Sequence, residues 1–164
     1  MKLVHATSAD RTTLIGLKHQ MNLSEFNWRT IANDRGAEDL DLSLEAVNGP
    51  IDRDLAALEN GTGGILLAYV KDNPVGYVSY AVKESSSSFR PEARKYLYVS
   101  GLAVDEAHRN GGIGAALLKA AESEATRLGI AKIMLDVSSV SPADVFYQRA
   151  GFAAVSQTMM KRLT

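Results

Sequence analysis

The chain has 164 residues, of which 46% are hydrophobic, 23% are charged and none is cysteine, and its formal net charge is −1. This length suits one domain spanning residues 1–164 with a core of its own, and the lack of cysteine excludes disulfides and thiolate metal sites. The near-neutral charge favours neither nucleic acid nor a membrane surface as a partner, and with no apolar span or signal-peptide core we expect a cytoplasmic protein.

The first half of the chain is predicted to begin with a strand at residues 2–6. Thr7 and Asp10 then have the spacing of a helix capping box, and Leu14, Leu17 and Met21 recur at helical spacing after it. Residues 22–63 are less regular, and their clearest helix covers residues 51–59. Two strands at 65–70 and 75–82, joined by a turn at 71–74, read as a hairpin, and 85–91 as a polar loop.

The next predicted strand, residues 96–104, changes its hydrophobic phase in the middle. Leu97 and Val99 mark one face at odd positions, whereas Leu102 and Val104 continue it at even positions. One extra residue in a strand has this effect, so the pattern predicts a β-bulge at Ser100 and Gly101.

A glycine-rich run, Arg109-Asn110-Gly111-Gly112-Ile113-Gly114, separates this strand from a helix predicted at residues 115–128. Unpaired backbone N–H groups at a helix N-terminus form an anion site, and glycines let a ligand approach the backbone closely. The run therefore predicts a cradle for a phosphate or pyrophosphate. Its spacing fits neither the Walker loop, which needs Lys and then Ser or Thr, nor the dinucleotide fingerprint, which needs a third glycine at Leu117.

The remainder of the chain predicts a short strand carrying Ile133, Leu135 and Val137, and a helix that opens at Ser141-Pro142 and ends at Gly151. A final strand is predicted over residues 152–160. Together these elements predict an α/β fold whose mixed, mostly antiparallel sheet is flanked by helices.

Two motifs resemble those of the GCN5-related N-acetyltransferases (GNATs). The first is Arg-x-x-Gly-x-Gly, at 109–114, after a strand that ends Leu102-Ala103-Val104-Asp105. The second is Phe146-Tyr147 followed by Gly151-Phe152. The resemblance covers most of the chain and implies the GNAT (acyl-CoA N-acyltransferase) fold. It also implies an enzyme that uses acetyl-CoA as cosubstrate and moves the acetyl group to a primary amine directly, with no metal.

The resemblance also implies roles for individual residues. Tyr147 would donate a proton to the departing thiolate, and a backbone N–H of Leu102 or Ala103 would stabilise the oxyanion. Val140 stands where many members have an asparagine, so that contact with the pantetheine is not carried over. The residues expected to contact acetyl-CoA are Leu102, Ala103, Val104, Arg109, Asn110, Gly111, Gly112, Ile113, Gly114 and Ala115.

The general base is left open. Many family members have a glutamate on the bulged strand, whereas this chain offers Tyr96, Tyr98 and Ser100 there. Either a water wire anchored by Tyr98 or Ser100 collects the proton, or a carboxylate from elsewhere, such as Glu84, does so. His108 is another candidate, although a histidine at this place more often belongs only to the turn.

The acceptor is also left open. Residues 34–59 contain eight acidic residues against two arginines, which suits a small cationic amine but also a solvated helical surface. Phe26 and Trp28 could line the acceptor site or pack in the core. The alternatives are a protein N-terminus or lysine as acceptor, and a non-catalytic acyl-CoA-binding module. A homodimer paired through strand 152–160 is a candidate assembly, and the acyl-chain length is undetermined.

Overall fold

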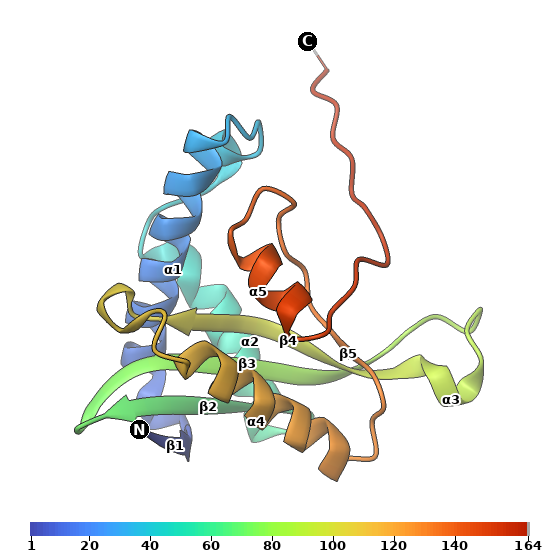
Figure 1. Cartoon of the computed structure of the whole chain (residues 1–164). Coiled ribbons are helices and arrows are strands. Elements are labelled where there is room, and N and C mark those ends of the chain that lie inside the picture. Colours follow the sequence, from blue (N-terminus) through green and yellow to red (C-terminus); the bar gives the residue numbers. More distant parts are fainter. Residues whose placement is uncertain (164) are drawn as a thin grey trace.

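The computed structural model describes residues 1–163 and contains one mixed sheet with helices on both faces (Figure 1). The strands lie in the order β1-β2-β3-β4-β5; all neighbours are antiparallel except β4 and β5, which are parallel. This confirms the predicted mixed, mostly antiparallel sheet. The strands are β1 (Lys2–His5), β2 (Gly63–Val70), β3 (Asn73–Glu84), β4 (Lys95–Val104) and β5 (Ile133–Met134).

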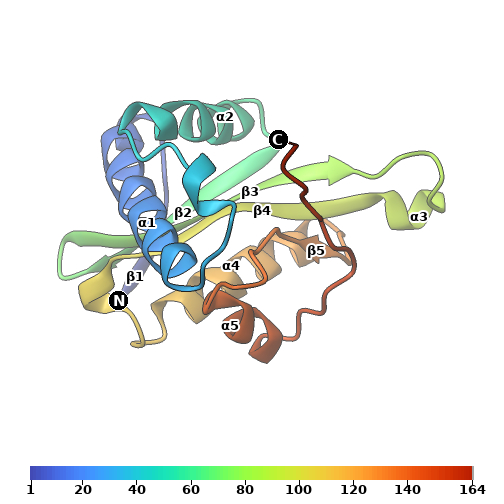
Figure 2. The same cartoon turned by 90° about the horizontal axis from the view of Figure 1, so that it is seen from above.

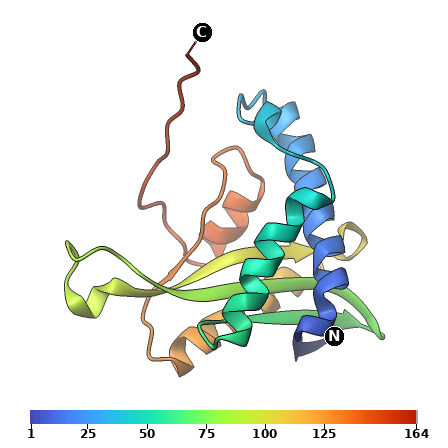
Figure 3. The same ribbon diagram turned by 180° about the vertical axis from the view of Figure 1, so that it is seen from behind.

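The helices form a layer on each side of the sheet. In Figure 2, α1 and α2 lie on one side and α4 and α5 on the other, and Figure 3 shows α1 and α2 against the sheet from behind. The predicted capping box is present, because Asp10 accepts hydrogen bonds from the backbone and side chain of Thr7. The helices are α1 (Arg11–Ile31), α2 (Asn48–Glu59), α3 (Pro91–Arg94), α4 (Ile113–Arg127) and α5 (Ala143–Arg149).

The core consists of two hydrophobic clusters, one on each face of the sheet. Successive residues of β2 alternate between them: Leu66 packs with Leu117 of α4, whereas Ile65 and Leu67 pack with Leu14 of α1. This alternation follows from the two-residue period of a strand. The sheet is therefore covered on both faces, and the central residues of β2 and β3 are buried.

The bulge predicted in β4 is present. Ser79 of β3 pairs with Gly101 and Tyr80 pairs with Val99, so Ser100 is the extra residue. Because of this insertion, Leu97 and Leu102 contact the same cluster on the α4 side even though their numbers differ in parity. The bulge thus lets both halves of β4 pack against the same cluster. It also makes Ser100 the residue of β4 that has no partner in β3.

Three predicted boundaries are wrong. Helix α1 continues to Ile31, through residues expected to be irregular, and ends shortly before Asn33, which has a φ of 53°. β5 has two residues instead of the predicted stretch to Val137. The predicted strand at 152–160 is absent from the described chain: this segment is extended and exposed, with Met159 87% accessible. It has no neighbouring strand, so a dimer through that edge remains a prediction without support from the fold.

Within residues 1–163, no helix combines the length and the apolar composition needed to cross a membrane.

The buried Tyr77 side chain is expected to make the fold less stable at alkaline pH. It is 1% exposed, and burial, followed by the charge of Asp54, raises the pKa of its phenol above the ordinary value of 10.0. Above pH 10 the unfolded chain releases a proton that the folded chain retains, so unfolding becomes more favourable. We expect Tyr77→Phe to reduce this loss by up to about 1.4 kcal/mol per pH unit. Urea unfolding at a series of pH values above neutrality measures it, and equal slopes for both proteins would contradict it.

Candidate active site

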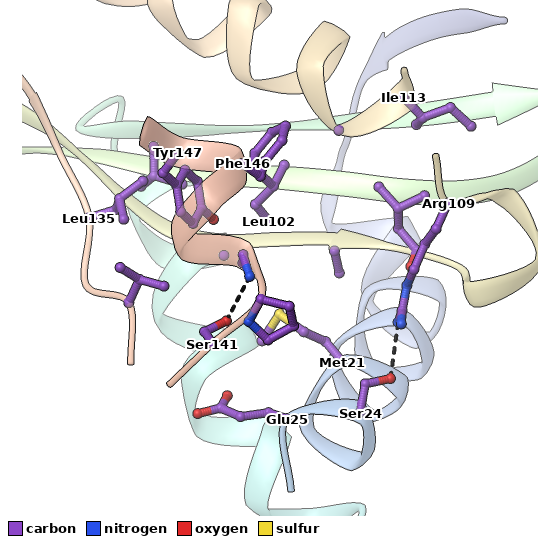
Figure 4. Close-up of a pocket in the computed structure, with 18 of the residues that line it drawn as sticks. Met21, Ser24, Glu25, Leu102, Arg109, Ile113, Leu135, Ser141, Phe146 and Tyr147 are labelled. Carbon is purple, nitrogen blue, oxygen red and sulfur yellow. Dashed lines mark hydrogen bonds between the residues drawn. The ribbon is translucent and has the colours of Figure 1, made fainter. Parts of the chain in front are cut away.

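A cavity of about 650 Å³ opens where β4 and β5 diverge (Figure 4). The two strands pair only at Leu97 with Ile133 and at Tyr98 with Met134. Beyond this point β4 and the segment after β5 line opposite parts of the cavity, which also reaches α1, α5 and the glycine-rich loop. Part of β4 therefore has an edge without a neighbouring strand, and its backbone is available to a ligand.

The glycine-rich loop forms one end of the cavity. It follows a short 3₁₀ turn, Glu106–His108, which Asp105 caps by accepting a hydrogen bond from the Ala107 N–H at 2.9 Å. Gly112 is the N-cap of α4 with a φ of 79°, and a Cβ built on it would have no atom within 4 Å. The first helical bond runs from the Ala116 N–H to the Gly112 carbonyl, which leaves the three preceding N–H groups without a helical acceptor.

Arg109 connects this loop to two other elements. Its Nε donates to the Val104 carbonyl and its Nη2 to Ser24 Oγ, both at 3.0 Å. Figure 4 shows this side chain reaching from the loop to α1. The guanidinium therefore contributes a positive charge beside the loop and also holds the loop against β4 and α1. The second of these roles, and the participation of Ser24, were not predicted.

Helix α5 brings aromatic side chains to the opposite part of the cavity. Tyr147 makes edge-to-face contacts with Phe146 and Phe152, at centroid distances of 5.1 and 5.7 Å. Phe146 and Tyr147 line the cavity beside Leu102 (Figure 4). Burial raises the pKa of Tyr147 to about 12, so the phenol holds its proton at neutral pH.

The profile of the acetyltransferase (GNAT) family matches residues 25–152 of the chain. The chain belongs to the GNAT family. Membership implies an acetyl-CoA-dependent acyltransferase, and it confirms the family resemblance carried by the two sequence motifs. Among proteins with curated descriptions, none has a sequence that matches.

Solved structures share the GNAT fold of this protein. A mutant of the BH1408 protein from Bacillus halodurans is 24% identical with a TM-score of 0.77, and 100% of each chain is covered. A GCN5-related N-acetyltransferase from Ralstonia eutropha is 25% identical with a TM-score of 0.73, over 99% of this chain and 97% of the other. A predicted acetyltransferase from Clostridium acetobutylicum, solved with acetyl-CoA, is 15% identical with a TM-score of 0.74, over 98% and 95%.

Most of the predicted site residues of this GNAT protein line the same cavity. All of the residues expected to contact acetyl-CoA line the cavity except Gly111, and Tyr147 lines it as well. Their roles remain predictions, because the arrangement shows only that they share one cavity.

Of the four side chains considered as the base or as its anchor, two line the cavity and two do not. Glu84 lies near the far end of β3, 3.9 Å from Lys95 Nζ, and does not line the cavity. His108 does line it, with its Nδ1 3.6 Å from Asp105. Of the two anchors considered on β4, Ser100 lines the cavity and Tyr98 does not.

Two carboxylates that sequence reasoning did not select are bonded to these anchors. Ser100 Oγ donates to Asp54 Oδ1 of α2, and Tyr98 Oη donates to Asp136 Oδ2 after β5, each at 2.7 Å. Asp54 occurred in the acidic stretch of the sequence, but its position on α2 relative to the β4 bulge needed tertiary structure. The sequence offered no signal for this pairing beyond the bulge itself.

Helix α1 supplies the remaining wall, with Lys18, Glu25 and Trp28 among its lining residues. Burial lowers the pKa of the Lys18 ammonium, while Asp54 and Glu25 oppose that shift. Trp28 thus lines the cavity, and Phe26 does not.

Proposed function

We propose that this protein transfers the acetyl group of acetyl-CoA directly to the primary amine of a small acceptor, with cationic amines as the favoured class. The observation that carries this proposal is one continuous cavity. It joins the N-terminus of α4, the unpaired edge of β4 and the Tyr147 side chain. An anion site, a backbone edge and a proton donor are three of the groups that acetyl transfer from this cosubstrate uses.

The residues present fit acetyl-CoA. The N–H groups of Ile113, Gly114 and Ala115 lie at the positive end of the α4 dipole, and the space beside Gly112 is open to a pyrophosphate. Arg109 adds a positive charge there. The unpaired edge of β4, from Leu102 to Val104, offers hydrogen bonds to the amides of a pantetheine arm, as an added strand would. When bound, acetyl-CoA supplies an acetyl group activated as a thioester.

Two groups of the protein would then assist the reaction, one at the oxyanion and one at the departing sulfur. The backbone N–H of Leu102 lies on the unpaired edge and donates to the developing oxyanion, whereas the N–H of Ala103, in register with Tyr77, points toward β3. The Tyr147 hydroxyl gives its proton to the departing sulfur. With a pKa of about 12, the phenol is present as the acid throughout the neutral range.

The charges at the acceptor end support a cationic substrate. Asp136 and Glu25 line the cavity, and Glu25 also pairs with Arg29. Asp54 is hydrogen-bonded to Ser100, whereas Lys18 is the cation of α1 on this wall. Carboxylates attract an ammonium group and orient it in the site. The flat ring of Trp28 adds an apolar surface, against which an alkyl chain or sugar can pack.

A thiol-release assay with acetyl-CoA and a panel of amines tests the proposal. The panel contains a polyamine, an aminoglycoside, free amino acids and short peptides with a free N-terminus or lysine. Saturable turnover on a small amine is the expected result. Turnover on peptides alone would replace the small acceptor by a protein one. Binding of acetyl-CoA in calorimetry without turnover on any amine would contradict the enzyme and favour a non-catalytic acyl-CoA-binding module.

A further inference from the structure

A chain of polar groups crosses from the core to the cavity at the β4 bulge. Ser100 Oγ lies 3.0 Å from Ser79 Oγ of β3 and 2.7 Å from Asp54 Oδ1 of α2. Ser79 is fully buried, Asp54 is half-buried, and Ser100 lines the cavity. The middle member of the chain is therefore the one that a bound acceptor can touch.

The hydrogen atoms of these three side chains can be placed by counting donors. A serine hydroxyl has one proton and two lone pairs, and an ionised carboxylate only accepts. Ser100 therefore donates to Asp54, and Ser79 must donate to Ser100. One lone pair of Ser100 remains, and it is available to a group in the cavity.

The fold maintains this arrangement with specific residues. The bulge places Ser100 as the unpaired extra residue of β4. At the next position, a Cβ on Gly101 would lie 2.7 Å from Tyr77 Oη and 2.9 Å from Ser79 Oγ, so a side chain there would displace one of them. Tyr77 itself holds its proton, because burial raises the pKa of its phenol. It cannot replace Asp54 as the proton acceptor.

We propose that Ser100 accepts the proton of the attacking amine and passes its own proton to Asp54, which makes this pair the proton acceptor of the reaction. The inference rests on the proposed acetyl transfer. A cationic acceptor first releases one proton to water. As the neutral amine nitrogen then bonds to the acetyl carbon, its N–H proton moves to Ser100 Oγ, and the Ser100 proton moves to Asp54. The C–S bond breaks with its electron pair on sulfur, which takes the proton of Tyr147. Water returns the proton from Asp54 to Tyr147 between turnovers.

Of the two carboxylates that line the cavity, Glu25 is in an ion pair with Arg29. The rival to Asp54 is therefore Asp136, which is exposed. Its neighbour Tyr98 does not line the cavity, and burial followed by the bond to Asp136 raises the pKa of Tyr98 to about 12. Because Tyr98 does not line the cavity, its phenol offers no relay from the acceptor to Asp136. Ser100 is the β4 side chain that both lines the cavity and contacts a carboxylate.

Variants of the two groups test the relay with the panel amine that gives the highest wild-type turnover. We expect Ser100→Ala and Asp54→Asn each to lower kcat about a hundredfold or more, and the double variant to fall no further. Ser100→Thr keeps a hydroxyl and should retain most of kcat, which a purely structural role of the pair would not require. The KM for acetyl-CoA should change little in all of them.

Asp52→Asn is the matched control, because Asp52 lies on the same helix in an exposed ion pair with Arg11. If the wild type is active and Asp54→Asn keeps the wild-type kcat, the relay is overturned while the proposed function stands. A loss of kcat found only in Asp136→Asn would have the same consequence. A wild type that turns over no amine would overturn the proposed function and the relay with it. Should Asp54→Asn fail to fold, the comparison of Ser100→Ala with Ser100→Thr decides: equal loss in both overturns the relay.

Discussion

Gly112→Val is expected to weaken acetyl-CoA binding about a hundredfold. Gly112 has a φ of 79° at the N-cap of α4, a conformation that a β-branched residue adopts only with strain. The valine side chain would also occupy the open space in which a pyrophosphate would approach the first N–H groups of the helix. Loss of two charge-assisted hydrogen bonds of about 1.5 kcal/mol each accounts for this factor. Calorimetric titration with acetyl-CoA measures it.

Gly129→Val is the matched control for this change. Gly129 lies just beyond the other end of α4, has a φ of 68° and likewise has no atom within 4 Å of a built Cβ. Both substitutions should therefore destabilise the fold by a similar amount, of order 1–2 kcal/mol. Affinity should fall only for Gly112→Val. Equal affinities for the two variants would contradict the location of the phosphate site.

Tyr147→Phe is expected to lower kcat by about a hundredfold to a thousandfold. The variant keeps the ring that packs between Phe146 and Phe152 and removes only the hydroxyl. Because the thiolate then leaves without a proton donor, the chemical step should slow while acetyl-CoA affinity stays the same. Steady-state kinetics and calorimetry together separate these two quantities.

The pH dependence gives a second measure of the same role. Since the pKa of Tyr147 is raised to about 12, the acid form persists and the wild-type kcat should show no alkaline decline from Tyr147 below about pH 11. Tyr69→Phe, on β2 outside the cavity, is the control and should leave kcat unchanged. A Tyr147→Phe protein with the wild-type kcat would show that the proton comes from another group.

The features that could be predicted best from the sequence are those that depend on neighbouring residues. The phase change between Val99 and Leu102 located the β4 bulge, because a strand face repeats every two residues. The run from Arg109 to Gly114 located the loop at the α4 N-terminus, since glycine and helix-forming residues follow each other directly. The Phe146-Tyr147 motif placed α5, and the structure brings Tyr147 to the cavity that the loop also lines.

Other features depend on contacts between distant segments. Asp54 reaches Ser100 across 46 positions of sequence, and Ser24 reaches Arg109 across 85. Neither pairing follows from spacing, because each needs the way α1 and α2 pack on the sheet. The failed strand prediction at 152–160 has the converse cause. An apolar segment becomes a strand only beside another strand, and β5 ends at Met134.

The most direct test of the account is a crystal structure of the wild-type protein with acetyl-CoA. We predict that the pyrophosphate accepts hydrogen bonds of about 3 Å from the N–H groups at the start of α4, between Gly112 and Ala115. The pantetheine should lie along the unpaired edge of β4, with its sulfur beside the Tyr147 hydroxyl. A coenzyme bound outside this cavity, or one whose sulfur lies far from Tyr147, would contradict the account.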